Sequence, residues 1–385
     1  MHVKVRRSFS QRNLGQKHRG PDGPALLHAL QVPEEDGYVG MHAFHPYPGR
    51  FHPLLVRRVL ELPSNQGPRR VLDPFMGSGT TLLEARRFGH EIVGNDLNPL
   101  SVRLTEMKLL QLSTTERIQL RRTLIDISQC AGEHEGWVDH PRLVELRTLY
   151  RPHTLAEMLH LWAVIQELEG VERLVAEMLL SACCVKFSTL ACDSQARVQE
   201  KAPHPKGAVF RWWADRTKAL IIALEEEAKQ SPRVPTTLRE GDMLSLVDLS
   251  GSADLILTSP PYPGTYDYAE HHHLRALWLE LPMEEFYDRE IGARRQSIEE
   301  WEEQGLHMLS GLEQLLAPEG RIYLVIGDWL GSQGPCEALK WVASVAEEVG
   351  LIVGNSASVV RATHFSVGRS TWDTPRWEHL IELAR

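Results

Sequence analysis

The stretch RRVLDPFMGSGTT, residues 69–81, decides the fold of this chain. Its apolar first half predicts a short buried strand, and its glycines predict a tight loop that opens into a helix over 82–88. Gly89 stands where the C-terminal cap of that helix belongs. A second strand is expected at 91–94, and it delivers Asp96 to its end. Strand, glycine loop, helix, strand and acidic residue begin a doubly wound α/β sheet.

The spacing within this unit also indicates the kind of ligand. Asp96 follows Gly77 by about 20 residues, the distance at which a carboxylate meets a pair of ribose hydroxyls. The third glycine of a dinucleotide-binding loop is missing, and no Lys-Ser or Lys-Thr follows the glycines as in a Walker loop. The loop therefore predicts close backbone approach to a ligand that carries no phosphate.

A second informative stretch is ADLILTSPPY, residues 253–262. It predicts a buried strand that stops abruptly, because two consecutive prolines cannot donate to a ladder and hold the preceding residue extended. The carbonyls of Ser259 and Pro260 are then expected to face an opening, with the flat ring of Tyr262 beside them. This arrangement suits a planar ring that bears an exocyclic amine. An ordinary proline-rich turn is the simpler interpretation.

The rest of the chain divides into a basic arm (1–37), a first core segment (38–112), a helical insertion (113–236) and a second core segment (237–385). The arm is expected to have little regular structure, and its cations either contact phosphates or belong to a solvated terminus. Helices are expected at 54–60, 153–168, 171–184, 212–229, 296–316 and 336–349, and strands at 237–244, 321–328, 351–354 and 378–383. Trp212 and Trp213, in the insertion, either stack on bases or belong to the core.

Composition limits the class of protein. The chain has 385 residues and a net charge of −9, which argues mildly against a nucleic-acid partner unless the cations cluster. Five cysteines without paired spacing indicate reduced thiols, and no signal peptide or membrane span is visible. We therefore expect a cytoplasmic protein with no membrane partner.

Three motifs together resemble those of S-adenosylmethionine-dependent DNA amino-methyltransferases, the cytosine-N4 and adenine-N6 family of Ser-Pro-Pro-Tyr type. They are VLDPFMGSGTT at 71–81 followed by Asp96-Leu97-Asn98-Pro99, TSPPY at 258–262, and HPYPGRF at 45–51. The resemblance covers about 40–112 and 237–385, and it implies a Rossmann-like methyltransferase sheet with a helical insertion. The order of the motifs differs from that of many Ser-Pro-Pro-Tyr enzymes, so the chain is a permuted or divergent member, and the insertion is a candidate for target recognition by position alone.

The resemblance also implies roles for residues. It assigns binding of S-adenosyl-L-methionine to Tyr47, Pro48, Asp73, Pro74, Phe75, Gly77, Ser78, Gly79, Thr80, Asp96, Asn98, Asp242 and Met243. It assigns catalysis to Ser259, Pro260, Pro261 and Tyr262, and we add Tyr266, Tyr268 and His271 as substrate-binding candidates. Asp242 and Met243 would meet the adenine, although Asp242 is equally explained as a turn residue. No metal is expected, because the adjacent histidines at 271–273 point in different directions on a helix.

Ser259 in the first position of the tetrapeptide implies methylation of cytosine N4 in DNA, with the base flipped out and stacked on Tyr262. Adenine N6 in DNA and guanine N2 in tRNA remain alternatives with the same chemistry, and a non-catalytic binder is an alternative of another class. The family further implies DNA as partner and RNA as the alternative, and a restriction nuclease or a defence system is a candidate partner whose presence the sequence does not indicate.

Overall fold

The computed structural model describes residues 15–33, 38–67, 69–190, 201–263, 267–293, 295–331, 334–360 and 376–385. Its centre is an eight-stranded sheet with the order β1-β9-β10-β6-β5-β2-β3-β4. The parallel strands are β2 (Arg70–Asp73), β3 (Glu91–Asp96), β4 (Thr236–Glu240), β5 (Ala253–Thr258) and β6 (Leu316–Gly327). β10 (Trp377–Ala384) runs antiparallel to β6 and to β9 (Ile352–Val360).

Consecutive strand residues point to opposite faces of the sheet, and each face has its own hydrophobic core. Val71 and Ile92 belong to one core, while their chain neighbours Leu72 and Val93 belong to the other. The first core also contains residues of α1 (Gly23–Leu30), α2 (Pro53–Leu60), α3 (Thr80–Arg87) and α4 (Pro99–Lys108). The second contains residues of α12 (Ile298–Leu315) and α13 (Ala338–Glu348). Both faces are covered, which confirms the expected doubly wound α/β fold.

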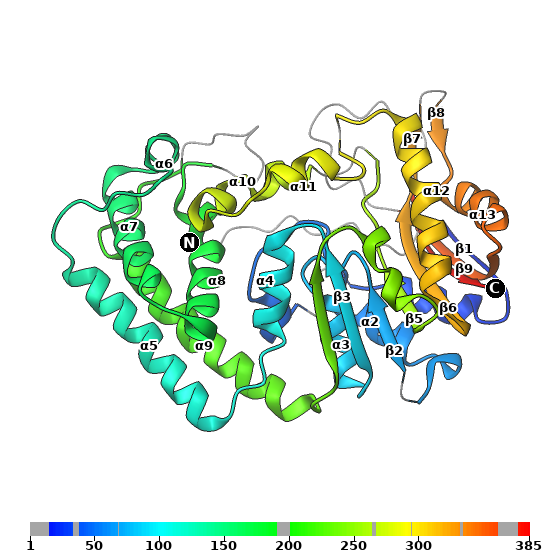
Figure 1. The fold of residues 1–385 in the computed structure, drawn as a ribbon, viewed down its shortest axis with the longest axis horizontal. Helices are drawn as coiled ribbons and strands as arrows, with labels where there is room; N and C mark the ends of the chain where they lie inside the picture. The colour runs from blue at the N-terminus through cyan, green and yellow to red at the C-terminus, as the bar shows by residue number, and fades with distance from the viewer. Residues whose placement is uncertain are drawn as a thin grey trace.

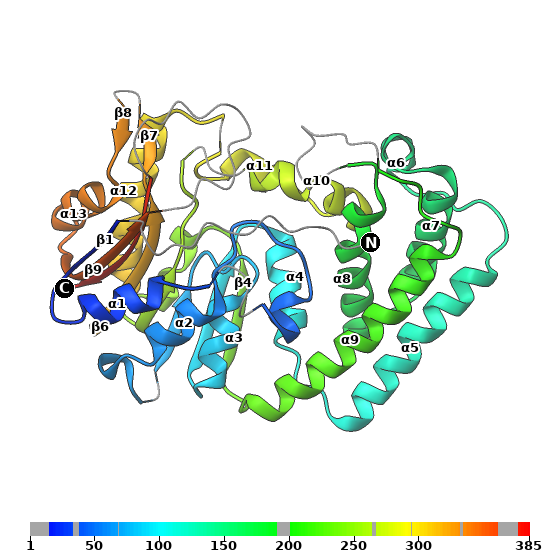
Figure 2. The same ribbon diagram turned by 180° about the vertical axis from the view of Figure 1, so that it is seen from behind.

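The described residues between β3 and β4 form α4 and then a group of helices beyond it. These are α5 (Thr114–Glu133), α6 (Leu143–Leu149), α7 (Pro152–Gln166), α8 (Gly170–Phe187) and α9 (Ala208–Gln230). Figures 1 and 2 show them gathered beyond the β4 edge of the sheet, opposite the edge formed by β1 and β9. α10 (Tyr268–Leu279) and α11 (Glu284–Arg289) extend from this group back over the sheet. A short hairpin of β7 (Trp329–Gly331) and β8 (Gly334–Cys336) completes the set.

The expectation of little regular structure in the arm is wrong for residues 15–33. β1 (Gln16–Arg19) adds an antiparallel strand to β9, and α1 follows with Leu26 and Ala29 fully buried. Pro24 falls in the first turn of α1, where its missing N–H costs nothing. The helix has only eight residues and polar neighbours, so its apolar face was not evident from the sequence. β1 has no alternation of apolar and polar residues, and its strand conformation depends on pairing with β9. Four cationic residues of the arm, Lys4, Arg6, Arg7 and Arg12, lie outside the described residues.

Two strands end at turns beside the cavity. β4 ends at Glu240 because Asp242 accepts a hydrogen bond from the Leu244 amide (2.8 Å) and begins a 3-10 turn. β5 ends at Thr258, directly before the Ser-Pro-Pro-Tyr stretch. None of the helices in the described ranges is long and apolar enough to cross a bilayer.

Candidate active site

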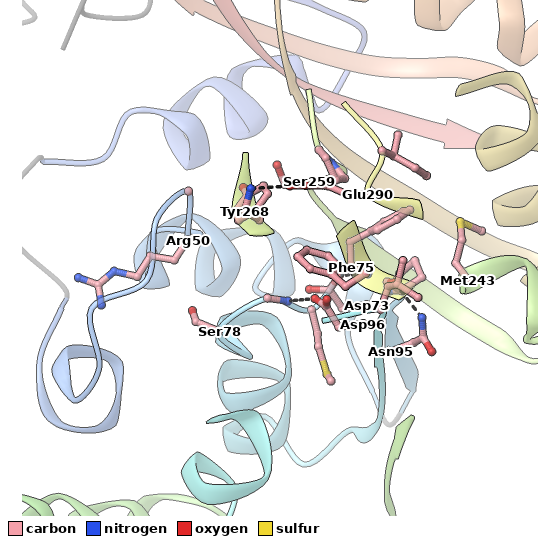
Figure 3. A pocket seen from close by; sticks show the side chains of 18 of the residues that line it. Arg50, Asp73, Phe75, Ser78, Asn95, Asp96, Met243, Ser259, Tyr268 and Glu290 are labelled. Atoms are coloured by element: carbon pink, nitrogen blue, oxygen red, sulfur yellow. Dashed lines mark hydrogen bonds between the residues drawn. The ribbon is translucent and has the colours of Figure 1, made fainter. Parts of the chain in front are cut away.

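One cavity lies over the C-terminal ends of β2, β3, β4 and β5, where a parallel α/β sheet places its ligands. It encloses about 890 Å³ of empty space, open mouth included. Figure 3 shows Ser259, Tyr268 and Glu290 toward one end and Met243 and Asn95 toward the other. The predicted residues that line it are Tyr47, Asp73, Pro74, Phe75, Gly77, Ser78, Thr80, Asp96, Asp242, Met243, Ser259, Pro261 and Tyr268.

Asp73 ends β2 and lies on the floor of the cavity, fully enclosed. Its Oδ1 accepts hydrogen bonds from the Phe75 amide (3.2 Å) and the Thr258 hydroxyl (2.7 Å). Burial raises the pKa of Asp73 to about 6, against the lowering effect of these donors. Thr258 immediately precedes the Ser-Pro-Pro-Tyr stretch, so this contact joins the two sequence motifs.

Asp96 ends β3 and holds the glycine loop from the other side. Its Oδ2 accepts from the Gly77 amide (2.8 Å) and its Oδ1 from the Asn98 amide (2.9 Å). Burial raises the pKa of Asp96 to about 7, although both amides favour the ionised form. An ionised carboxylate has about four lone-pair sites, more than the two amides occupy, and the residue lines the cavity. Asp96 can therefore accept from a pair of hydroxyls.

The glycine loop is tightly packed from behind. Gly79 has a φ of +74°, and a Cβ there would lie 2.7 Å from the Thr105 side chain. The ammonium of Lys108 donates to the Ser78 carbonyl (2.7 Å) from a fully buried position. Burial, together with the nearby Arg50 charge, lowers the pKa of Lys108 to about 7. Both α4 contacts hold the loop in one conformation.

The segment that contains HPYPGRF forms a side wall. Tyr47 donates to or accepts from Ser101 on α4 (2.8 Å) and packs against His272 of α10, with ring centroids 4.8 Å apart. Figure 3 shows the Arg50 guanidinium pointing away from the two aspartates, and Nη1 donates to the His42 carbonyl (2.8 Å). Arg50 therefore fixes the backbone of this segment.

Asp242 and Met243 close the end of the cavity beyond β4. Besides capping its own turn, Asp242 forms an ion pair with Arg289 at the end of α11. Arg289 also pairs with Glu285 one turn earlier (2.8 Å). The turn interpretation of Asp242 is thus confirmed, and α11 is attached to the loop that was predicted to meet an adenine.

Ser259 faces the cavity, while Tyr262 lies behind it. The two hydroxyl oxygens are 3.0 Å apart, and the Tyr262 ring packs among residues of the second core. The Pro261 carbonyl accepts from Trp301 Nε1 (3.2 Å). Gly292 has a φ of +77°, and a Cβ there would be 2.9 Å from the Tyr262 carbonyl, so glycine is required at this crossing.

Glu290, which the sequence did not single out, is the other buried acid of the cavity at 1% exposure. It accepts from the Tyr268 amide at the start of α10 and pairs with Arg295 (3.3 Å). Burial raises the pKa of Glu290. Its geometry is that of a cap for α10 that keeps Tyr268 at the cavity.

Some predicted residues lie elsewhere. Those outside the cavity lining are Pro48, Gly79, Asn98, Pro260, Tyr262 and His271, and Tyr266 lies outside the described residues. Asn98 instead caps α4 by accepting from the Leu100 amide (3.0 Å). Of the three adjacent histidines, it is His272 that is fully buried beside Tyr47, because one residue turns a helix by about 100°.

Two groups of lining residues were not predicted as site residues. Phe286, Arg289, Glu290 and Ile291 come from α11 and the loop after it, whereas Gly49, Arg50, Phe51, Met76, Asn95, Leu97 and Gly241 lie within or beside the predicted motifs. Asn95 could have been predicted from its position directly before Asp96, whereas no local sequence feature indicates that α11 lines the cavity. Among the described residues no group of three or more His, Cys, Asp or Glu could hold a metal ion.

Sheet order and cavity define the class of this protein as a Rossmann-like α/β protein with a ligand site at the C-terminal ends of its strands. Sequence comparison adds a similarity to a known family. Residues 7–107 match the N6_N4_Mtase family, described as DNA methylase. This part of the chain is thus similar to the DNA amino-methyltransferases, as the motifs predicted.

Two curated relatives with similar sequences are methyltransferases by name. The type II methyltransferase M.MvaI of Kocuria varians is 23% identical over 271 residues, 63% of this chain and 58% of that protein. The type II methyltransferase M.MjaII of Methanocaldococcus jannaschii is 37% identical over 112 residues, 27% of this chain and 20% of that protein. The chain thus spans less than two thirds of the length of either relative.

Solved structures give weaker matches. The rRNA methyltransferase aviRa from Streptomyces viridochromogenes is 15% identical, with 93% of this chain and 95% of that chain covered and a TM-score of 0.35. TrmN from Thermus thermophilus is 12% identical, with 88% and 50% covered and a TM-score of 0.30. Similarity at this level supports no argument about substrate.

Proposed function

We propose that this protein transfers a methyl group from S-adenosyl-L-methionine to the exocyclic amine of a DNA base, cytosine N4. One observation carries the proposal: Ser259 lines the same cavity as the glycine loop and Asp96. A cofactor held by that loop and an amine held by Ser259 would therefore meet inside one enclosure.

The residues present fit the cofactor. Asp96 offers acceptors for ribose hydroxyls, and Met243 offers a thioether for packing on an adenine ring. Asn95 Oδ1 is buried in the lining with no hydrogen-bond partner among the described residues, and it could accept from a bound ligand. S-adenosylmethionine, when bound, supplies a methyl group on a positively charged sulfur.

The chain's own task is to hold the amine. An aromatic amine is a weak nucleophile because its lone pair is delocalised into the ring. A hydrogen bond from that NH2 to Ser259 Oγ would favour a pyramidal nitrogen and aim it at the methyl group. The proton becomes acidic once the nitrogen is methylated, so a strong base is not needed. The Tyr262 hydroxyl, in contact with Ser259 Oγ, would fix the serine rotamer.

The choice of cytosine rests on Ser259, and the choice of DNA rests on the match of residues 7–107 to a family described as DNA methylase. In a duplex the base must leave the stack to enter the cavity. A cytoplasmic enzyme that works beside a restriction nuclease or a defence system is the setting we propose for it.

Mass spectrometry of nucleosides tests the proposal. DNA and tRNA are each incubated with the protein and methyl-labelled S-adenosylmethionine, and the label is expected in N4-methylcytosine from DNA. Ser259→Ala and Tyr262→Ala should reduce transfer strongly and leave cofactor binding intact, whereas Ser250→Ala, at an exposed serine, serves as the control. Label confined to methyladenine or methylguanine would overturn the choice of base. Absence of cofactor binding would reject the enzyme function.

A further inference from the structure

We propose that Tyr268, rather than Tyr262, provides the aromatic face on which the target base stacks inside the cavity. This role rests on the proposed transfer to a DNA base and names the side chain that holds the flipped base. It departs from the family resemblance, which placed that face on Tyr262 of the Ser-Pro-Pro-Tyr stretch. The two tyrosines are close together in the chain, yet they have different surroundings in the fold.

Tyr262 packs against the second core and is not part of the cavity lining. Its hydroxyl oxygen lies 3.0 Å from Ser259 Oγ, so a turn of the ring into the cavity would break this contact. The backbone around it is also held from behind, because the Pro261 carbonyl accepts from Trp301 Nε1 (3.2 Å). A Cβ on Gly292 would lie 2.9 Å from the Tyr262 carbonyl. This position suits support of Ser259 and not stacking on a base.

Tyr268 lies at the end of the cavity that contains Ser259. It is a half-buried lining residue, and Figure 3 shows it beside Ser259 and Glu290. Its amide donates to the buried carboxyl group of Glu290. Because Tyr268 is the first residue of α10, this contact fixes the point at which its side chain leaves the helix. An amine that donates to Ser259 Oγ would therefore bring its base next to Tyr268.

Two other rings set the orientation of the Tyr268 ring. The His272 ring, one helical turn further on, lies at 24° to it with the centroids 6.4 Å apart. The Tyr47 ring lies 6.2 Å from Tyr268 and 4.8 Å from His272. Burial, together with the Arg275 charge, holds the pKa of His272 well below its usual range, so this ring is neutral. Tyr268 is thus held by uncharged aromatic neighbours.

Among the described residues, the other aromatic side chains of the cavity lining are Tyr47, Phe51, Phe75 and Phe286. Tyr47 covers the glycine loop, since a Cβ on Gly77 would lie 3.4 Å from its ring. Phe75 belongs to that loop segment, and Phe51 packs against the first core. Phe286 belongs to α11, whose last residue pairs with Asp242 at the other end of the cavity. Tyr268 is therefore the aromatic residue placed to meet a base held by Ser259.

The two tyrosines would contribute different parts of their side chains. A flipped base loses its neighbours in the duplex, and an aromatic ring replaces part of that stacking whichever base it is. At position 268 the ring is what matters, so phenylalanine should serve as well as tyrosine. At position 262 the hydroxyl contacts Ser259, so phenylalanine should serve less well. The two positions are thus expected to respond in opposite ways to loss of the hydroxyl.

The test measures single-turnover transfer of labelled methyl groups from S-adenosylmethionine to unmethylated genomic DNA, which offers many short recognition sequences. Tyr268→Leu removes the ring, whereas Tyr268→Phe and Tyr262→Phe each remove one hydroxyl. Phe88→Leu, at a partly exposed aromatic residue at the end of α3 away from the glycine loop, is the control. Calorimetric binding of S-adenosylmethionine shows whether each variant is folded and binds cofactor.

Tyr268→Leu should lower the transfer rate constant roughly 5- to 100-fold with cofactor affinity unchanged, because less of the bound DNA has its base held in the cavity. Tyr268→Phe and Phe88→Leu should stay close to the wild type, and Tyr262→Phe should not. A wild-type rate in Tyr268→Leu, equal losses in Tyr268→Leu and Tyr268→Phe, or loss of cofactor binding in Tyr268→Leu would each overturn this role.

The same experiment separates this role from the proposed function. Transfer to DNA by the wild type, without the expected effect of Tyr268→Leu, would reject the stacking role and leave the proposed function in place. Absence of transfer to DNA by the cofactor-bound wild type would reject the proposed function, and the stacking role with it.

Discussion

At the scale of single residues, two buried carboxyl groups organise the cavity. Asp73 and Asp96 end adjacent parallel strands, so the sheet places them side by side. Each accepts backbone amides of the loop it supports, and burial raises the pKa of both. Their protonation therefore changes in a range where an ordinary aspartate is always ionised.

Asp96→Asn should change how stability depends on pH. The pKa of Asp96 is about 7 in the folded protein and about 3.9 in the unfolded chain, so the folded state holds more protons between these values. Asp96 therefore lowers the free energy of unfolding as pH rises from about 4 to about 7, by up to roughly 4 kcal/mol. Urea denaturation at a series of pH values should show a flatter dependence for the variant; identical slopes would contradict the raised pKa.

The same substitution tests the ribose role. Ionised Asp96 is the better acceptor, so cofactor affinity of the wild type should fall as pH drops through about 7. Asp96→Asn should bind roughly 10- to 100-fold more weakly above that pH and lose the pH dependence. Calorimetry with S-adenosylhomocysteine measures both, and wild-type affinity in the variant would exclude the contact.

Tyr262→Phe separates the hydroxyl of this residue from its ring. The hydroxyl contacts Ser259 Oγ at 3.0 Å, and its loss should reduce kcat about 3- to 10-fold by freeing the serine. Cofactor affinity should not change, because Tyr262 is not in the cavity lining. Steady-state kinetics with a DNA substrate give the answer; an unchanged kcat would show that the hydroxyl does not position Ser259.

At the scale of elements, α11 connects the two ends of the cavity. Its last residue, Arg289, pairs with Asp242, and the next residue, Glu290, caps α10. Phe286 of the same helix lines the cavity. A six-residue helix thus touches both the proposed adenine end and the segment that carries Tyr268.

Arg289→Ala should weaken cofactor binding about 3- to 10-fold and speed its dissociation, because the cover formed by α11 loses its ion pair with the Asp242 loop. Stopped-flow fluorescence of cofactor release measures the effect. Glu285→Ala is the matched control, since Glu285 is an exposed partner of Arg289 on the same helix. Equal rates for Arg289→Ala and wild type would remove α11 from cofactor retention.

At the scale of the whole molecule, a buried network of charges joins the insertion to the sheet. Glu227 near the end of α9 pairs with Arg86 (3.1 Å) and Arg87 of α3. Arg87 also pairs with Glu84, which pairs with His42 (2.7 Å) in the segment before the side wall. Burial opposes ionisation of Glu227, but the Arg87 contact holds its pKa below the usual value.

Glu227→Gln should destabilise the protein by about 3–5 kcal/mol, because it leaves buried arginine charge without its partner. Differential scanning calorimetry would detect this as a lowered Tm. Glu226→Gln, at the neighbouring exposed position, should change stability little. A Tm equal to the wild type in Glu227→Gln would show that the network does not hold the insertion.

Features could be predicted from the sequence when the residues that form them are close together in the chain. The β2 strand, the glycine loop and Asp96 lie within 30 residues, and their apolar runs, glycines and spacing specify a conformation directly. Ser259 could be found for the same reason, since consecutive prolines end a strand wherever they occur. Asn98 caps α4 and His271 lies outside the cavity lining, and no sequence pattern indicates either position.

The sequence by itself determined the parallel sheet, the loop and carboxylates at its C-terminal edge, and the relation to amino-methyltransferases, because each depends on residues that are neighbours in the chain. Only the tertiary structure decided that β1 pairs with β9 and that α11 lines the cavity. Arg289 meets Asp242 across 47 residues, and Arg151 meets Lys201 across 50. Such contacts form because the sheet and its cores bring distant segments together, and the residues involved carry no local signal of their partner.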